Sequence, residues 1–150
     1  MARRAAVAKD RPDDRRPPVL EFCVHGRPVS ARTRNRALLA DWQRQIHRAA
    51  QAAWPINRPA YEGAVELRIT HYSERPLADM DNLIKPIQDA LQGVVYPNDR
   101  MVKDISGNWR NIDGHFRLRY ISQVLAAAFS DGRQFVHVRL WLAPDEEDLG

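Results

Sequence analysis

The alternation of two hydrophobic periodicities is the feature that most restricts the fold of this chain. Four stretches have the apolar content typical of β-strands, and three stretches between them have apolar residues at helical spacing. The predicted strands are 19–24, 64–72, 101–109 and 134–142, and the predicted helices are 35–54, 83–91 and 120–129. The expected order of elements is therefore β-α-β-α-β-α-β.

This order favours a small α+β fold in which a mixed sheet has the helices packed against one of its faces. A dinucleotide-binding α/β fold is excluded, because no glycine-rich phosphate loop follows the first strand. Asn35 is the expected N-cap of the first helix, and Pro55 is expected to end it. Trp42 and Trp54 are expected in the core.

The ends of the chain differ in composition from its centre. Residues 1–18 are rich in Arg, Asp and Pro, and we expect a disordered basic arm there. Residues 144–150 form an acidic tail. The 150-residue length suits one domain, which we place at 19–143.

Charge and hydropathy restrict the partners of the chain. The net charge is +4 despite the acidic tail, which favours a polyanionic partner such as nucleic acid. No apolar run is long enough for a membrane span, and no signal-peptide core follows the N-terminus. We therefore expect a cytoplasmic protein with no membrane partner. Cys23 is the only cysteine, which rules out an internal disulfide and a zinc site built on cysteines.

The segment 79–91 carries the most informative set of polar residues. Asp79 and Asp81 are two positions apart, so their side chains share a face only if the backbone is extended. Pro86 disfavours helix at the residue before it and lacks a backbone N–H. We therefore predict that the helix begins close to Pro86 and that both aspartates lie on its extended approach.

Convergent carboxylates repel each other unless a cation lies between them. Asp99 is a third carboxylate, which the turn after the helix can return to the same end of that helix. Three hard oxygen ligands suit Mg²⁺, with Mn²⁺ as a substitute. An N-cap or turn role remains open for each aspartate alone. No small-molecule cofactor is expected, and the five histidines show no metal-ligand spacing.

The pattern Asp79-x-Asp81-Asn82-x-x-Lys85-x-x-x-Asp89-Ala-Leu, followed by Gly93-Val-Val-Tyr and an acidic turn, resembles the signature of the RusA-type Holliday junction resolvases. The segment Gly26-Arg27-Pro28-Val29-Ser30 resembles the start of family members. The similarity extends over 19–143.

The resemblance implies a homodimer that binds four-way DNA junctions and cuts them symmetrically with magnesium. Its catalytic acids correspond to Asp79, Asp81 and Asp99, and its motif lysine to Lys85. Asn98 departs from the family, in which this turn is usually doubly acidic. The spacing of Asp89 from Lys85 favours a structural ion pair.

The chemistry expected from the residues agrees with this resemblance. A bound metal would activate water, and Lys85 could stabilise the reacting phosphate or form a salt bridge. Basic residues after the first strand and on the first helix are candidates for DNA phosphate contacts. They are Arg27, Arg32, Arg34, Arg36, Arg44 and Arg48.

Two other classes compete with a junction-cutting nuclease. The first is a branched-DNA-binding protein with little or no catalysis. The second is an enzyme that uses Asp-x-Asp differently, such as a haloacid-dehalogenase-type phosphatase. That class places the motif directly after an apolar strand, whereas here Arg75 and Pro76 lie shortly before it.

Overall fold

The computed structural model describes residues 17–77, 79–114 and 121–143, and its elements follow the predicted order. They are β1 (Leu20–His25), α2 (Arg36–Ala53), β2 (Val65–Ser73), α3 (Met80–Ala90), the short 3-10 helix η2 (Asp99–Met101), β3 (Val102–Asn111), α4 (Gln123–Asp131) and β4 (Phe135–Leu142). The predicted tail 144–150 and nearly all of the predicted arm 1–18 lie outside the described residues.

The four strands form one mixed sheet in the order β1-β4-β2-β3. β4 lies antiparallel to β1 and to β2, whereas β2 and β3 are parallel. Two adjacent parallel strands need a long crossover between them, and α3 lies in that connection. The predicted α+β class is therefore confirmed.

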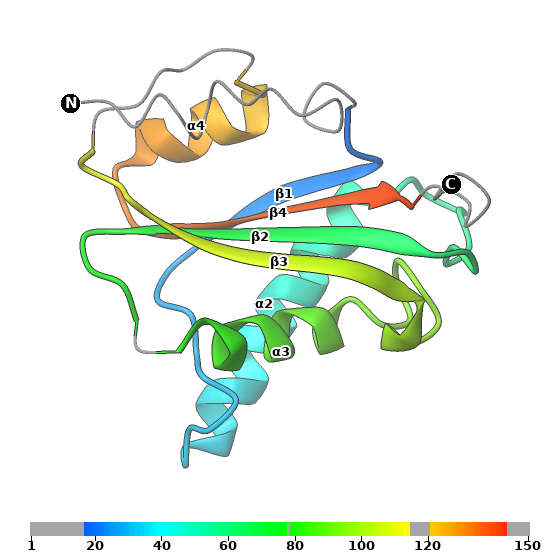
Figure 1. Cartoon of the computed structure of the whole chain (residues 1–150), viewed down its shortest axis with the longest axis horizontal. Helices are drawn as coiled ribbons and strands as arrows, with labels where there is room; N and C mark the ends of the chain where they lie inside the picture. Colours follow the sequence, from blue (N-terminus) through cyan, green and yellow to red (C-terminus); the bar gives the residue numbers. More distant parts are fainter. Residues whose placement is uncertain (1–16, 78, 115–120, 144–150) are drawn as a thin grey trace, which may run out of the picture.

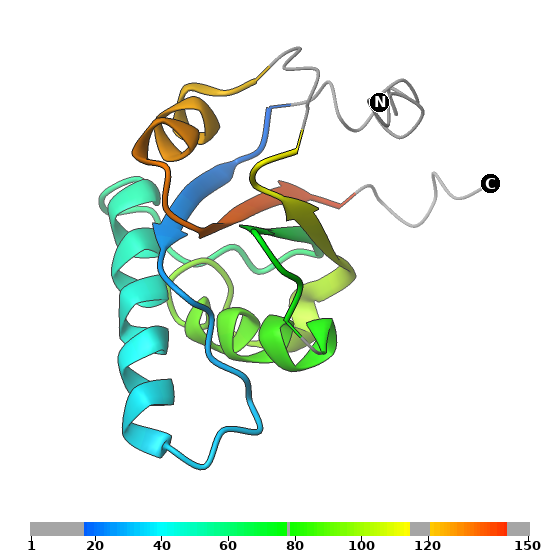
Figure 2. The ribbon, with the colours of Figure 1, turned by 90° about the vertical axis from the view of Figure 1, so that its left-hand side faces the viewer.

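The main core lies between the sheet and the pair α2 and α3, which cover one face (Figures 1 and 2). Leu20, Phe22 and Val24 point into it from β1, as their alternation predicts. Trp42 and Trp54 are buried there, which confirms their predicted place. α2 is amphipathic, and none of the helices in the described residues is long and apolar enough to cross a membrane.

α4 lies across the other face of the sheet, so the prediction of helices on a single face holds for α2 and α3 only (Figure 1). Ser122 caps its N-terminus, and Gly132, with φ 82°, ends it in the left-handed conformation. Its underside packs on a small aromatic group, in which Tyr72 stacks on Phe135 at 4.8 Å.

The N-terminal half of α3 lies very close to β3. A Cβ atom added to Gly107 would come within 2.4 Å of Cδ1 of Ile84 and 2.7 Å of Cγ of Met80. Only the absence of a side chain at this position lets the helix approach so closely. Gly107 thus helps to fix the helix that carries most of the acidic motif.

Candidate active site

α3 begins at Met80, six residues before Pro86, so the prediction that the helix starts close to this proline is wrong. Asp79 is extended, with φ −143° and ψ 106°, and its side chain accepts a hydrogen bond from the Asp81 N–H at 3.1 Å. Asp81 therefore lies in the first helical turn. The Asp79 cap and the buried stripe of Leu83 and Ile87 stabilise the helix across the proline.

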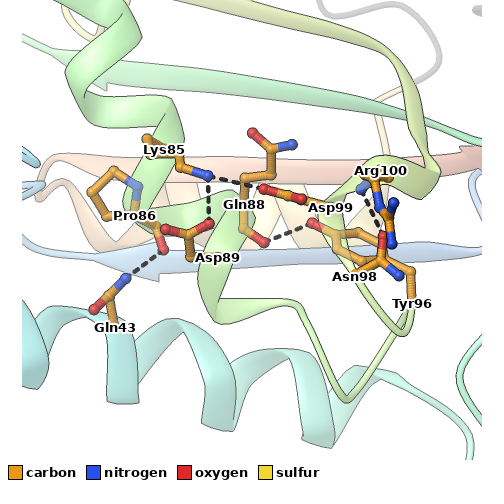
Figure 3. Close-up of polar contacts among 9 residues, drawn as sticks. All are labelled: Gln43, Lys85, Pro86, Gln88, Asp89, Tyr96, Asn98, Asp99 and Arg100. Carbon is orange, nitrogen blue, oxygen red and sulfur yellow. Dashed lines mark hydrogen bonds and ion pairs between the residues drawn. The ribbon is translucent and has the colours of Figure 1, made fainter.

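The proline is tolerated because neighbouring segments satisfy the groups around it. Pro86 has no N–H for the carbonyl of Asn82, four residues earlier. That carbonyl instead accepts a hydrogen bond from the backbone N–H of Ala31 at 2.8 Å. The carbonyl of Pro86 accepts another from Nε2 of Gln43 on α2 at 3.2 Å (Figure 3). Because Pro86 leaves the Asn82 carbonyl free to accept from Ala31, the loop between β1 and α2 is attached to α3.

Two aspartates lie at the start of α3. Asp79 accepts hydrogen bonds at both oxygens, since Nδ2 of Asn82 donates to the second one at 2.9 Å. Asp81 is exposed and has no side-chain partner among the described residues. The partial positive charge of a helix N-terminus favours anionic groups close to it.

Lys85 lies between two further carboxylates (Figure 3). Its Nζ is 2.9 Å from Oδ1 of Asp89 and 2.9 Å from Oδ2 of Asp99, which confirms the predicted pair with Asp89. The hydrogen bonds that Lys85 donates to Asp89 and Asp99 raise the pKa of Lys85, and the one to Asp99 lowers the pKa of Asp99. Lys85 is therefore a stable cation.

A short turn brings Asp99 to the side of α3. The hydroxyl of Tyr96 donates to the carbonyl of Gln88 at 2.7 Å, which pins the turn to the helix (Figure 3). Oδ1 of Asn98 accepts from the Arg100 N–H at 3.0 Å and caps η2, which begins with Asp99. Asn98 thus has a structural role in shaping this turn.

The three predicted metal ligands lie in two places. Asp79 and Asp81 are at the start of α3, whereas Asp99 contacts Lys85, which lies four residues and about 6 Å further along the helix axis than Asp81. Across residues 17–77, 79–114 and 121–143, no group of three or more His, Cys, Asp or Glu side chains is placed to hold a metal ion. The donor chemistry suits Mg²⁺, since all three are carboxylates near the surface. The metal set stays a prediction.

Comparison with known proteins decides the family. The family model described as Endodeoxyribonuclease RusA matches residues 23–118. The chain belongs to the RusA endodeoxyribonuclease family. The match extends from β1 through β3 and includes all of α3, and it confirms the predicted resemblance. A search of curated proteins finds no significant match.

Membership of this nuclease family makes the predicted DNA-contacting arginines of particular interest. Arg32 and Arg34 are exposed on the loop that the hydrogen bond of Ala31 attaches to α3, and Arg36 is exposed at the first residue of α2. Arg36 braces that loop, because its Nη1 donates to the carbonyls of Ala31 and Thr33.

The remaining predicted arginines lie at the start of that loop and on α2. Arg27 is exposed just after β1, and Arg44 and Arg48 are exposed on α2. Arg44 pairs with Asp41 at 3.5 Å. The DNA contacts themselves remain a prediction.

Sequence reasoning missed Gln43 altogether, and it found Tyr96 in the family signature without predicting its contact with α3. Both donate to backbone carbonyls of α3 from other elements. Pro86 indicates that the carbonyl of Asn82 needs a donor from outside the helix, but the sequence does not show which residue supplies it. Nothing in the sequence indicates that Gln43 and Tyr96 donate to carbonyls of α3.

Proposed function

We propose that the chain is a magnesium-dependent endonuclease that cuts four-way DNA junctions by paired, symmetric strand cleavage as a homodimer. Membership of the RusA endodeoxyribonuclease family carries the nuclease part of this proposal. The placement of Lys85 supports the chemistry, because it lies on the same helix as Asp81 and holds Asp99 beside that helix.

Asp79, Asp81 and Asp99 would hold the metal, either Mg²⁺ or Mn²⁺. The ion would supply an activated water and neutralise charge on the phosphate. Lys85 has two carboxylate partners, so it can release Asp99 to the metal and keep Asp89. Its free N–H groups can then donate to a phosphate oxygen, where negative charge grows during cleavage.

The arginines after β1 suit a substrate that is recognised by its backbone. Contacts to phosphates position DNA but carry no base-sequence information, as recognition of a branched shape requires. The bond between Ala31 and Asn82 keeps this loop beside the start of α3. A twofold dimer would present two such sites in equivalent positions, which suits symmetric cuts on opposed strands.

A second candidate function is a branched-DNA-binding protein with weak or absent catalysis. Asn98 is the observation that favours it, because an amide stands where the family usually has a second carboxylate. An amide oxygen can coordinate a metal but adds no negative charge. Cleavage rather than binding therefore has to decide between the two functions.

The deciding experiment is cleavage of a labelled four-way junction in Mg²⁺, with linear duplex and single strands alongside. We expect paired symmetric nicks on the junction. Asp81→Asn should abolish them and leave junction binding intact. Asp104→Asn, at an exposed position on β3, is the matched control and should cut normally.

Each alternative outcome has a distinct meaning. Tight junction binding without cleavage in Mg²⁺ or Mn²⁺ would exclude the nuclease and support the binding protein. Equal cutting of the junction and linear duplex would exclude junction selectivity while retaining the nuclease.

A further inference from the structure

A hollow of about 600 Å³ opens at the end of the sheet where β1 and β2 finish and β4 begins. Its lining comes from four separate segments of the chain. They contribute Gly26 and Arg27, the run Ser73, Glu74, Arg75 and Leu77, then Ile112, and finally Gly132, Arg133 and Gln134.

The charge of this lining is predominantly positive, with three arginines against Glu74. Arg133 has a partner, because its Nε and Nη2 donate to the carboxylate of Asp131 at 2.5 and 3.1 Å. No carboxylate in the part of the chain that the structure describes pairs with Arg27 or Arg75. The hollow therefore has cationic groups available to an anionic ligand.

The walls of the hollow are held by hydrogen bonds. Oγ of Ser73 donates to the carbonyl of Arg75 at 2.6 Å and accepts from Nε1 of Trp109 at 3.0 Å. Two other lining residues are also joined, because the Gly26 N–H donates to the carbonyl of Gln134 at 3.0 Å. Ordered walls reduce the entropy that a ligand must remove on binding.

His71 contacts Gln134, one of the residues that line the hollow. It is buried, and its Nε2 lies 3.1 Å from Oε1 of Gln134. Burial, together with the charge of Arg27, lowers the pKa of His71. The imidazole is therefore neutral at neutral pH, and the arginines supply the charge of the hollow.

The hollow adjoins the acidic site. Leu77 lines it and Asp79 caps α3 two residues later, so their Cα atoms are at most about 7 Å apart. The link from β2 runs from this end of the sheet toward the start of α3 (Figure 1). A nucleic-acid strand that reaches Asp79 can therefore extend into the hollow.

We propose that this hollow is a phosphate-binding subsite for the DNA strand that enters the acidic site. The guanidinium groups of Arg27 and Arg75 donate to phosphodiester oxygens, and Arg133 adds positive charge at the rim. Leu77 and Ile112 give the adjacent sugar or base an apolar wall. This subsite rests on the proposed function, since it takes DNA as the substrate.

The test is the salt dependence of DNA binding by the full chain, measured in EDTA so that no strand is cut. Arg75→Gln and the pair Arg75→Gln with Arg133→Gln are compared with Arg58→Gln. The control Arg58 is exposed and lies 5.1 Å over the ring of Trp54, away from the hollow. Labelled four-way junction and single-stranded oligonucleotide are the two probes.

We expect Arg75→Gln to weaken binding about tenfold and to reduce the salt slope by about one. Arg75→Lys should restore the slope, because the charge returns. Arg58→Gln should match the unsubstituted chain. Unchanged affinity and slope in both the single and the double variant, with normal thermal unfolding, would overturn the subsite.

Different outcomes would exclude the proposed nuclease function and the proposed phosphate subsite. A chain that loses DNA affinity with Arg75→Gln but never cuts a junction in Mg²⁺ would retain the subsite and lose the nuclease. A chain that cuts junctions with an unchanged salt slope in the variants would retain the nuclease and lose the subsite. Failure of the unsubstituted chain to bind either probe would overturn both.

Discussion

Two charged clusters lie on opposite faces of the sheet and differ mainly in their contact with water. Lys85, Asp89 and Asp99 form the first on the side of α3, where the Lys85 side chain is 52% exposed. Glu21 and His137 form the second beneath α4, where the His137 side chain is 2% exposed. In both clusters a nitrogen donor contacts a carboxylate. Only in the exposed cluster can the carboxylates exchange that donor for a ligand from solution.

The hydrogen bonds of the buried cluster join the N-terminus of α4 to strands β1 and β4. Oε2 of Glu21 accepts from Oγ of Ser122 and lies 2.6 Å from Nε2 of His137. Burial alone would raise the pKa of Glu21, but hydrogen bonds from His137 and Ser122 outweigh it and lower that pKa. Burial lowers the pKa of His137, so a neutral imidazole donates to an ionised carboxylate.

This cluster does not have the arrangement of a nucleophilic site. The hydroxyl of Ser122 donates to the carboxylate of Glu21 and not to a histidine, and the same oxygen caps α4 by accepting from the Leu125 N–H. Burial raises the pKa of the neighbouring Cys23 to about 12, so its thiol stays protonated. Buried charge thus holds α4 on the sheet, whereas exposed charge remains available to a ligand.

Removal of Lys85 should sharpen this contrast most strongly. We expect Lys85→Met to slow junction cleavage about 100-fold or more, because a donor to the reacting phosphate is lost. Thermal stability should change little, since an exposed ion pair contributes little to folding. Single-turnover cleavage beside thermal unfolding measures both quantities, with Lys103→Met as the control. Cleavage within a few-fold of the unsubstituted rate would remove Lys85 from the mechanism.

Removal of Glu21 should give the opposite pattern. Glu21→Ala leaves the N–H of His137 and the hydroxyl of Ser122 without their acceptor, and this should cost about 2–4 kcal/mol of unfolding free energy. The folded fraction should cleave at the normal rate. Urea denaturation measures the loss, and Glu62→Ala, at an exposed position, is the control. A stability loss no larger than that of the control would show that the buried cluster is dispensable.

The pH dependence of stability should come from the buried cluster. The folded pKa of His137 lies below its ordinary 6.5, so the unfolded chain takes up protons first as the pH falls. Unfolding free energy should therefore decline from about pH 7 to about pH 5. The lowered pKa of Glu21 adds a further decline below about pH 4.5.

Urea denaturation across this range tests the prediction. His71 has a lowered pKa for the same reason, so His137→Gln should flatten the slope without abolishing it. An identical slope in His137→Gln and the unsubstituted chain would assign the pH dependence to other groups.

Local patterns predicted most of the elements, and contacts between distant segments account for the remainder. The Asn35 cap, the buried face of β1 and the ion pair of Lys85 with Asp89 follow from spacing alone, and the structure has all three. The place of α4 does not follow from spacing, because its short apolar face fits either side of a sheet. The hollow was also missed, since Arg27 and Arg75 meet only when β1 and β2 end at the same edge.

The start of α3 is the clearest case of a local rule overruled by a distant contact. Pro86 should disrupt the helix because the Asn82 carbonyl loses its partner and the proline ring crowds it. The Ala31 N–H supplies the missing donor from a loop far away in the sequence. The proline therefore creates an attachment point between the arginine loop and the acidic helix.

Pro86→Ala should have the smallest effect of these substitutions. It should weaken the attachment of the arginine loop to α3. The new N–H competes for the Asn82 carbonyl, so the Ala31 amide should exchange its hydrogen faster and the loop should become less ordered. We expect junction affinity to fall a few-fold while the cleavage step, which depends on Lys85, keeps its rate. Gln43→Met is the control, because it removes the bond to the Pro86 carbonyl and leaves the Asn82 carbonyl untouched. Unchanged exchange at Ala31 would mean that the loop is ordered by its own contacts, including those of Arg36.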